Sequence, residues 1–302
     1  MPAPLPKPAG LDRTGLWQGV AAYLIWGLLP LYFVALKRVG AGEVVASRIG
    51  FSLLFLAVVV TVSGRFAKLR AALVDRRIVL ALIASALLIS VNWLVYIWAV
   101  QNGQVLAGSL GYFLNPLINV LLGVVVLKER LTRIQGAAVA LAAVGVAVLA
   151  AGAGQALWIS LMLGVSFGLY GLMRKMVRVE SLEGLTIETA ILTPIAVGYL
   201  VWLSSHGGMA FGREATTTTL LVVAGVVTAV PLLLFAASAR RLPYATVGLL
   251  QYIAPTLQFL LAVLVLGERL TVPHVICFAC IWAGLALYVA GSVREVRRRT
   301  PG

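Results

Sequence analysis

The sequence predicts an all-α integral membrane protein of ten transmembrane helices, arranged as two inverted five-helix repeats. Three observations predict this class. The 302 residues are 61% hydrophobic and 11% charged, with a mean hydropathy of +1.02, whereas a soluble domain carries about 25% charged residues. The apolar residues fall into runs long enough to cross a bilayer. In addition, a segment of the first half recurs in the second half.

Each predicted span is an apolar run, and a helix needs about 20 such residues to cross the hydrocarbon core. The runs predict spans at 16–36, 43–63, 78–100, 105–127, 134–152, 155–173, 184–204, 218–238, 243–266 and 272–292. A basic flank precedes the first run, as in a signal peptide. That run is too long for the apolar core of a signal peptide, so we interpret it as a retained helix.

The basic residues of the predicted loops lie mostly on one side of the membrane. Loops rich in Lys and Arg remain in the cytoplasm. With the amino terminus inside, the inner side carries Lys7, Arg13, Arg65, Lys68, Arg70, Arg76, Arg77, Lys128, Arg130, Arg133, Arg174, Lys175, Arg178, Arg240, Arg241, Arg294, Arg297, Arg298 and Arg299. The outer side carries Lys37, Arg38, Arg213 and Arg269. This bias predicts that both termini are cytoplasmic. It also explains the net charge of +14 without nucleic acid as a partner.

A repeated segment shows how the spans are organised. Residues 126–132 recur as residues 265–271, both ending in Glu-Arg-Leu-Thr, and Pro116 aligns with Pro255. Two copies of five spans must face opposite ways, because five is odd. The predicted parts are a cytoplasmic tail at 1–15, a first repeat at 16–152, a second, inverted repeat at 153–292 and a basic cytoplasmic tail at 293–302.

Polar side chains within the spans are the candidate binding residues, because burying them in hydrocarbon is costly. In the fourth span Asn115 and Asn119 share one helical face, and in the ninth span Gln251 and Gln258 do the same. Hydrogen bonding between helices is the alternative reading of such amides. The predicted substrate-binding residues are Tyr23, Trp26, Asn92, Tyr96, Asn115, Asn119, Tyr170, Gln251, Tyr252 and Gln258.

Prolines within spans predict kinks near these residues. Pro116, Pro255 and Pro231 each remove a backbone hydrogen bond and free a carbonyl one turn earlier. Broken helices with exposed backbone lie at the binding level of several transporter folds.

Two charged residues lie within spans, Arg48 in the second and Glu188 in the seventh. They occupy equivalent positions of the two repeats, and we expect them on opposite sides of the midplane rather than paired. Glu188 is the candidate proton-coupling residue, and Arg48 is a second candidate for coupling or gating. The alternative for both is that the side chain extends to the nearer membrane surface.

The sequence gives no sign of metal, cofactor or catalytic chemistry. Cys277 and Cys280 lie in an apolar helix, and the histidines His206 and His274 have no metal-ligand spacing relative to them. Neither a phosphate-binding loop nor a catalytic triad is present. We therefore expect no enzyme, no metal and no cofactor.

Four motifs resemble a known family. The stretches Ala21–Gly27, Asn92-Trp93, Ser109–Asn119 and Gln251–Thr256 resemble the RarD permeases, a branch of the EamA family in the drug/metabolite transporter superfamily. The resemblance implies a ten-helix inverted-repeat fold in a bacterial inner membrane, and a central cavity lined mainly by spans 1, 3, 4, 6, 8 and 9. The family's cargo is diverse, so the fold does not identify the solute.

The predicted function is that of a secondary transporter for a small organic solute, a metabolite or a drug-like molecule. The two halves would alternate access around a midplane cavity, with protons as the candidate coupling ion. A mostly neutral polar lining favours a neutral or zwitterionic solute. The alternative is a non-transporting membrane partner or regulatory protein of the same fold. The sequence predicts no oligomeric state.

Overall fold

The structure is a computed structural model that describes residues 12–36, 38–101, 105–151, 157–265 and 272–299. Within these ranges the chain forms helices joined by turns and short loops, without any β-strand. The predicted all-α class is confirmed for this part of the chain.

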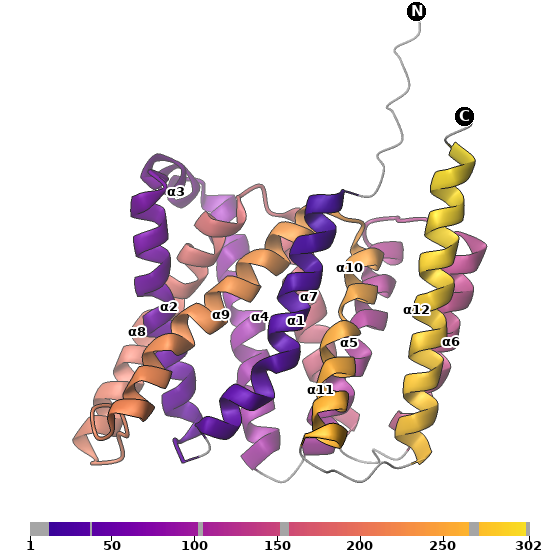
Figure 1. The fold of residues 1–302 in the computed structure, drawn as a ribbon. Coiled ribbons are helices and arrows are strands. Elements are labelled where there is room, and N and C mark those ends of the chain that lie inside the picture. Colours follow the sequence, from indigo (N-terminus) through magenta and orange to yellow (C-terminus); the bar gives the residue numbers. More distant parts are fainter. Residues whose placement is uncertain (1–11, 37, 102–104, 152–156, 266–271, 300–302) are drawn as a thin grey trace, which may run out of the picture.

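The helices stand side by side, and the start of α1 lies at the same end of the bundle as the end of α12 (Figure 1). In order they are α1 (Arg13–Ala35), α2 (Ala41–Val62), α3 (Phe66–Val74), α4 (Arg76–Gln101), α5 (Val105–Val125), α6 (Arg133–Ala150), α7 (Leu157–Met176), α8 (Ser181–Ser205), α9 (Ala215–Arg241), α10 (Tyr244–Leu250), α11 (Ile253–Leu264) and α12 (Val272–Arg299).

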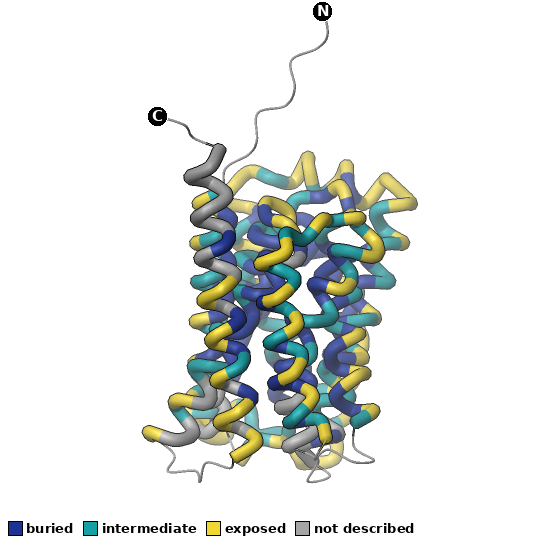
Figure 2. The backbone as a smooth tube through the Cα atoms, turned by 90° about the vertical axis from the view of Figure 1, so that its right-hand side faces the viewer, coloured by how far each residue is buried: buried dark blue, intermediate teal, exposed yellow. Residues whose placement is uncertain are grey.

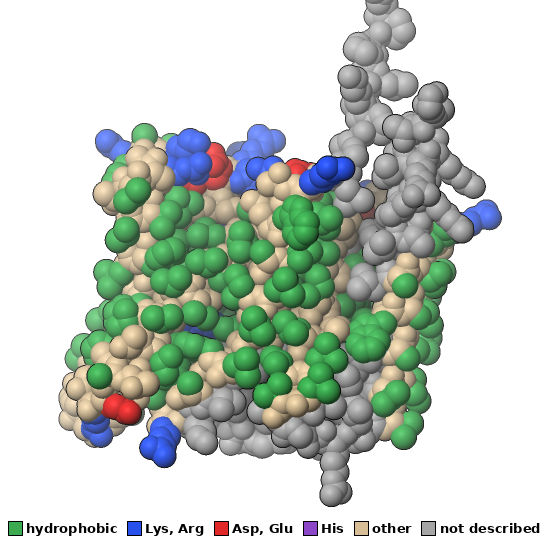
Figure 3. Space-filling view, in the orientation of Figure 1, with side chains coloured by type: hydrophobic (Ala, Val, Ile, Leu, Met, Phe, Trp, Pro, Cys, Tyr) green, Lys and Arg blue, Asp and Glu red, His purple; other side chains and the backbone are tan. Residues whose placement is uncertain are grey.

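The helices have the length and surface of membrane spans. Among the described residues, six are long and apolar enough to cross a membrane, namely Ala41–Val62, Arg76–Tyr96, Arg133–Ala150, Leu157–Met176, Ser181–Ser205 and Ala215–Arg241. Shorter apolar helices are Gly111–Val125 and Val275–Gly284. Large apolar side chains such as Leu54, Val58 and Ile195 are exposed. Figure 3 shows hydrophobic side chains covering a broad belt below a rim of Lys and Arg. Water does not tolerate an apolar surface of this extent, so the chain is a multi-pass membrane protein.

Three helical segments differ from the predicted spans. Helix α3 lies between the second and third spans, where the hydropathy pattern predicts a loop. Helix α12 continues to Arg299, so most of the predicted tail at 293–302 is helical. The ninth span, predicted as one helix at 243–266, is interrupted between α10 and α11.

Backbone chemistry explains the interruption of the ninth span. Residues Gln251 and Tyr252 form a turn between the two helices. Pro255 has no N–H, so it cannot donate to the Gln251 carbonyl one turn earlier. The N–H of Ala254 donates to that carbonyl instead, at 3.3 Å, and the N–H of Tyr252 donates to the Leu249 carbonyl at 3.2 Å. These tighter bonds span three residues, as in a 3₁₀ turn.

Buried residues face the inside of the bundle and exposed residues its outside (Figure 2). The central core includes Leu56 of α2, Ala86 of α4, Tyr170 of α7 and Phe235 of α9. A second core includes Phe113 of α5, Ala142 of α6, Leu249 of α10 and Cys277 of α12. The bundle therefore buries two apolar clusters, with α5 and α10 beside the second.

Glycines allow α5 and α7 to approach closely. A Cβ atom at Gly164 would lie 2.6 Å from Cδ1 of Ile118, and one at Gly168 would lie 2.7 Å from Cγ2 of the same residue. Small residues have this role in membrane bundles, where close packing rather than water drives helix association.

Replacing Gly168 with alanine is expected to destabilise the bundle by about 1–3 kcal/mol, because the added methyl group overpacks the α5–α7 contact. The matched control is Gly198→Ala in α8, where a Cβ atom would meet nothing within 4 Å. Unfolding of both variants in mixed detergent micelles tests this. Equal midpoints for the two variants would contradict the packing argument.

Candidate functional site

A narrow cavity of about 20 Å³ lies between α2, α4, α7, α8 and α9. A cavity of this size has room for about one water molecule. Its polar wall consists of Ser52, Trp93, Tyr170, Glu188, Thr189 and Thr228, and aliphatic side chains complete it. Two residues predicted from the sequence, Tyr170 and Glu188, therefore border one enclosed space.

The cavity involves helices that the family resemblance did not imply. Helices α2 and α8, the second and seventh predicted spans, line it together with α4, α7 and α9. The α1 side of the core is filled by aromatic rings, and the α5 side by hydrogen-bonded amides, as described below. Ring and amide packing therefore leaves the open volume beside α2 and α8.

Glu188 forms a buried ion pair with Arg174. The Arg174 Nη1 atom lies 3.5 Å from Glu188 Oε1, and the two side chains are 1% and 3% exposed. Ser85 of α4 donates its hydroxyl hydrogen bond to the same carboxylate oxygen, while Arg174 Nη2 donates to the Ser181 carbonyl at 3.1 Å. Glu188 Oε2 has no hydrogen-bond partner within the described residues. One carboxylate oxygen beside the cavity is thus available to a ligand or proton.

Arg174 corrects the assignment of loop charges. The hydropathy pattern places it among the basic residues of an inner loop, but α7 continues to Met176 and buries it. The guanidinium occupies the space above Gly184, where a Cβ atom would overlap Arg174 Nη1. An inward-facing Arg174 is tolerated because Glu188 compensates its charge and Gly184 leaves the space.

Arg48 lies on the α2 side of the same cavity. Its Nε atom donates to the Thr228 hydroxyl at 2.8 Å, and its guanidinium lies 5.2 Å from the centre of the Trp93 ring, within the range of a cation–π contact. Both partners line the cavity. Arg48 is therefore held by α4 and α9, while Glu188 is paired with Arg174.

Aromatic rings fill the centre of the bundle beside the cavity. Trp26 of α1 lies 5.9 Å from Phe167 of α7 and 5.7 Å from Phe235 of α9, measured between ring centres. Tyr23 lies 5.5 Å from Trp26, and Tyr170 lies 6.2 Å from Phe235. The predicted residues Tyr23, Trp26 and Tyr170 thus form one cluster, in which the rings contact each other. Phe167 and Phe235 complete the cluster.

A second group of predicted residues joins α5 to the interrupted ninth span. Asn119 Nδ2 donates to Gln251 Oε1 at 2.5 Å. Within the described residues, Asn115 Oδ1, Asn119 Oδ1 and the Tyr252 hydroxyl are buried without a hydrogen-bond partner. Leaving such atoms unpaired is costly. Asn115, Asn119, Gln251 and Tyr252 form what we call the α5–α10 amide group. Its unpaired oxygens can bind a polar ligand.

Prolines and a glycine position the α5–α10 amide group. Pro116 lies inside α5, between Asn115 and Asn119. A Cβ atom at Gly248 of α10 would lie 2.7 Å from the Pro116 carbonyl oxygen, so the glycine lets the two backbones approach. Pro255 follows the break in the ninth span, and Pro231 lies inside α9.

Asn92 and Tyr96 make their contacts with residues outside these two groups. Asn92 donates to the Leu163 carbonyl at 2.9 Å and to the Ser166 hydroxyl at 3.1 Å, which ties α4 to α7. Tyr96 packs against Tyr112, with ring centres 5.6 Å apart. The side chain of Gln258 lies outside the described residues.

Five residues that line the cavity or contact Glu188 were not predicted: Ser52, Ser85, Arg174, Thr189 and Thr228. Four of them carry hydroxyl groups, which can donate hydrogen bonds to backbone carbonyls of their own helix or of a neighbouring helix. Ser52, for example, donates to the Gly225 carbonyl at 3.0 Å, and Thr189 donates to the Leu185 carbonyl at 2.7 Å. Hydroxyls are common in apolar helices, so only their position near Glu188 could have singled them out.

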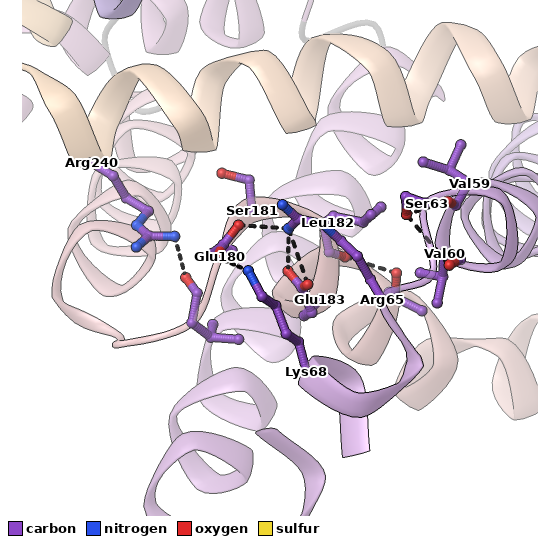
Figure 4. A network of polar contacts seen from close by, with 12 residues as sticks. Val59, Val60, Ser63, Arg65, Lys68, Glu180, Ser181, Leu182, Glu183 and Arg240 are labelled. Atoms are coloured by element: carbon purple, nitrogen blue, oxygen red, sulfur yellow. Dashed lines mark hydrogen bonds and ion pairs between the residues drawn. The ribbon is translucent and has the colours of Figure 1, made fainter. Parts of the chain in front are cut away.

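An ionic network anchors the start of α8 to the loop that follows α2 (Figure 4). Arg65 Nη1 lies 2.5 Å from Glu180 Oε2 and 3.1 Å from Glu183 Oε1, and Lys68 Nζ lies 2.7 Å from Glu180 Oε1. Hydrogen bonds from Lys68 and Arg65 lower the pKa of the Glu180 carboxyl to about 2. The network keeps Glu180 charged through the physiological range.

Because its pKa is lowered in the folded state, Glu180 contributes stability above its ordinary pKa near 4.5, and this contribution is lost as the pH falls towards 2. The Glu180→Gln variant is expected to be less stable than the native chain at neutral pH by at most about 1 kcal/mol, since the pair is exposed. Unfolding midpoints of both proteins measured from neutral to acidic pH should converge below pH 4.5. A gap that persists unchanged in acid would contradict this assignment.

A mirrored anchor lies at the opposite end of α2. The buried Glu43, in the first turn of α2, accepts hydrogen bonds from the N–H groups of Ala210 and Phe211 at 2.8–2.9 Å. These residues belong to the loop that follows α8. Thus α2 and α8 are fastened together at both ends by a carboxylate of one helix and the loop after the other.

Comparison with known proteins adds family evidence to this geometry. The profile of the EamA-like transporter family matches residues 13–151 and again 155–290. An uncharacterized transporter of Pseudomonas aeruginosa is 47% identical over 290 residues, covering 95% of this chain and 96% of that protein. Protein RarD of Streptomyces exfoliatus is 43% identical over 288 residues, covering 95% and 91%. A solved crystal structure of a protein superposes with a TM-score of 0.71 at 19% identity, covering 91% of this chain and 96% of that one, which shows a shared fold.

Proposed function

Since this chain belongs to the EamA-like transporter family, we propose that it is a secondary transporter that moves a small organic solute across the membrane by alternating access. The match to the family profile and the similarity to RarD proteins confirm the family predicted from the motifs. The chain is a multi-pass membrane protein of a transporter family. The observation that carries the proposal is the buried Arg174–Glu188 pair beside an internal cavity, because ionised groups inside a membrane bundle are costly without a function.

The proposed architecture is ten spans in two inverted five-helix repeats. The family profile matches the chain twice, which supports two related units. If α1, α2 and α4 correspond to α7, α8 and α9, the packed pair α1·α9 corresponds to α4·α7, and α2·α9 corresponds to α4·α8. All four contacts are present.

The two carboxylate anchors support the same symmetry. Glu43 and Glu183 each lie in the first turn of their helix, and each holds the loop that follows the other helix. An inverted repeat places one anchor at each membrane face. We propose the two repeats at 16–152 and 153–292, with short cytoplasmic tails on either side.

We propose that the protein lies in a bacterial inner membrane with both termini in the cytoplasm. Although Arg174 is buried and no longer counts as a loop residue, the other Lys and Arg residues of the loops still lie mostly on the predicted inner side. The rim of Lys and Arg at the end that holds the start of α1 and the end of α12 supports this orientation (Figures 1 and 3).

We propose that the solute binds between the aromatic cluster and the α5–α10 amide group, in a conformation more open than the present one. Rings that now contact each other would stack on the solute, and the unpartnered oxygens of Asn115 and Asn119 would accept its hydrogen bonds. The lining favours a neutral or zwitterionic solute. Glu188 would carry the coupled proton, with Arg174 as its counterion and Arg48 across the cavity.

The test is flux through the purified chain in liposomes. A thermal-shift screen of metabolites first identifies a solute, because ligand binding stabilises the folded state. Asn119→Ala and Gln251→Ala are expected to lower its transport about fivefold each, since a buried hydrogen bond contributes about 1 kcal/mol. Ser90→Ala in α4, whose hydroxyl bonds only within its helix, serves as the control. Native rates in both amide variants would contradict the site, and absence of any flux would favour a non-transporting role.

A further inference from the structure

Helix α3 has an apolar face that the bundle does not cover. Phe66, Leu73 and Val74 are 56%, 53% and 78% exposed. Phe66, Arg70 and Leu73 are spaced i, i+4 and i+7, so they share one face of the helix. The outward face of α3 therefore combines large apolar side chains with an arginine.

The opposite face of α3 is held by the protein. Leu69 and Ala72 pack into a cluster with Val179 and Ile187 of the α8 region. Lys68 forms an ion pair with Glu180. The orientation of α3 is therefore set by its inner face, and its outer face remains directed away from the bundle.

The outer face of α3 lies beside a concentration of positive charge. Arg70, Arg76 and Arg77 are all exposed, and the last two begin α4 directly after α3. The nearby acid, Asp75, accepts hydrogen bonds from the backbone N–H groups of Arg77 and Ile78. Figure 1 shows α3 at the end of the bundle where α1 starts, and Figure 3 shows Lys and Arg gathered along that end above the apolar belt.

We propose that α3 is an interfacial helix that binds anionic phospholipid. Phe66, Leu73 and Val74 would enter the acyl-chain region, while the guanidinium groups of Arg70, Arg76 and Arg77 would bind the phosphate groups. The charge of this surface fits an anion, and its apolar side chains fit the tails attached to that anion. Helix α3 is also joined through Lys68 and the neighbouring Arg65 to the start of α8, the helix that carries Glu188. Bound lipid would therefore stabilise the anchored end of α8.

Unfolding of the full chain in neutral detergent micelles tests this proposal. Adding phosphatidylglycerol is expected to raise the midpoint more than adding phosphatidylcholine, and salt should reduce the difference by screening. Each basic residue near an anionic surface contributes about 1 kcal/mol, so the triple variant Arg70→Gln/Arg76→Gln/Arg77→Gln should bind phosphatidylglycerol on the order of 100-fold more weakly. Native mass spectrometry measures that binding directly.

Two control variants separate the components of the surface. Arg38→Gln, an exposed arginine at the other end of the bundle, should leave the phosphatidylglycerol effect unchanged. Leu73→Ser should weaken phosphatidylglycerol binding without removing charge. The proposal is overturned if both lipids act equally or if the triple variant binds as the native chain does. It is also overturned if glycerol phosphate alone reproduces the stabilisation, since the apolar face would then have no role. None of these readouts depends on transport.

Discussion

Replacing Arg174 with methionine is expected to destabilise the protein by about 3–5 kcal/mol, the largest stability effect that we predict for a single substitution. The change removes the cation from a pair in which both side chains are at most 3% exposed. Glu188 would then be a buried charge held only by the Ser85 hydroxyl. Unfolding in mixed micelles, followed by intrinsic tryptophan fluorescence, measures the loss.

A double variant distinguishes loss of charge compensation from simple loss of packing. Arg174→Met/Glu188→Met removes both charges, and it is expected to be close to the native stability or above it, because an apolar pair incurs no desolvation cost. Arg178→Met, an exposed arginine in the turn after α7, serves as the single-charge control. A double variant no more stable than Arg174→Met alone would show that the pair is not the cause.

Glu188→Gln is expected to abolish accumulation of solute driven by a pH gradient while solute exchange continues. One proton coupled to each solute molecule supports about tenfold accumulation for each pH unit across the membrane. Glutamine has nearly the same shape and can accept the Ser85 hydrogen bond, but it cannot carry the proton. The expected accumulation ratio therefore falls from about ten to about one for each pH unit.

Paired assays in liposomes measure this effect. Uptake against an imposed pH gradient reports coupling, and counterflow at equal pH reports the solute pathway alone. Glu214→Gln, at the exposed start of α9, should behave as the native chain in both. Normal gradient-driven accumulation by Glu188→Gln would show that Glu188 does not take part in coupling. Loss of both accumulation and counterflow would show that Glu188 has a structural role.

The sequence predicts the location of the helices well because hydropathy is a local sum. A run of about 20 apolar residues crosses a membrane whatever it later contacts, so the class and most of the helical ranges were accessible without a structure. The end of the sixth span was harder to predict. Whether Arg174 belongs to a loop or to the interior depends on Glu188 and Gly184, which lie on another helix.

For the candidate site too, one part could be predicted from the sequence and another part could not. The identities of Tyr23, Trp26, Tyr170, Asn119 and Gln251 were visible as polar or aromatic residues inside apolar runs. Their grouping was not, since periodicity within one helix says nothing about which helix it faces. Asn92 illustrates the limit. The sequence predicts a binding residue at this position, and only the structure adds that its amide donates to Leu163 and Ser166 of α7.

Composition and the apolar runs determined that this chain belongs in a membrane and where most of its helices run, and four sequence motifs determined which family it resembles. These properties depend on residues close in sequence, and bilayer thickness turns them into a simple length rule. Only the tertiary structure decided that Glu188 pairs with Arg174, that Arg48 is held by Thr228 and Trp93, and that α3 leaves an apolar and basic face uncovered. Those outcomes depend on charge compensation, steric space and burial between distant segments, which exist only after the helices have packed.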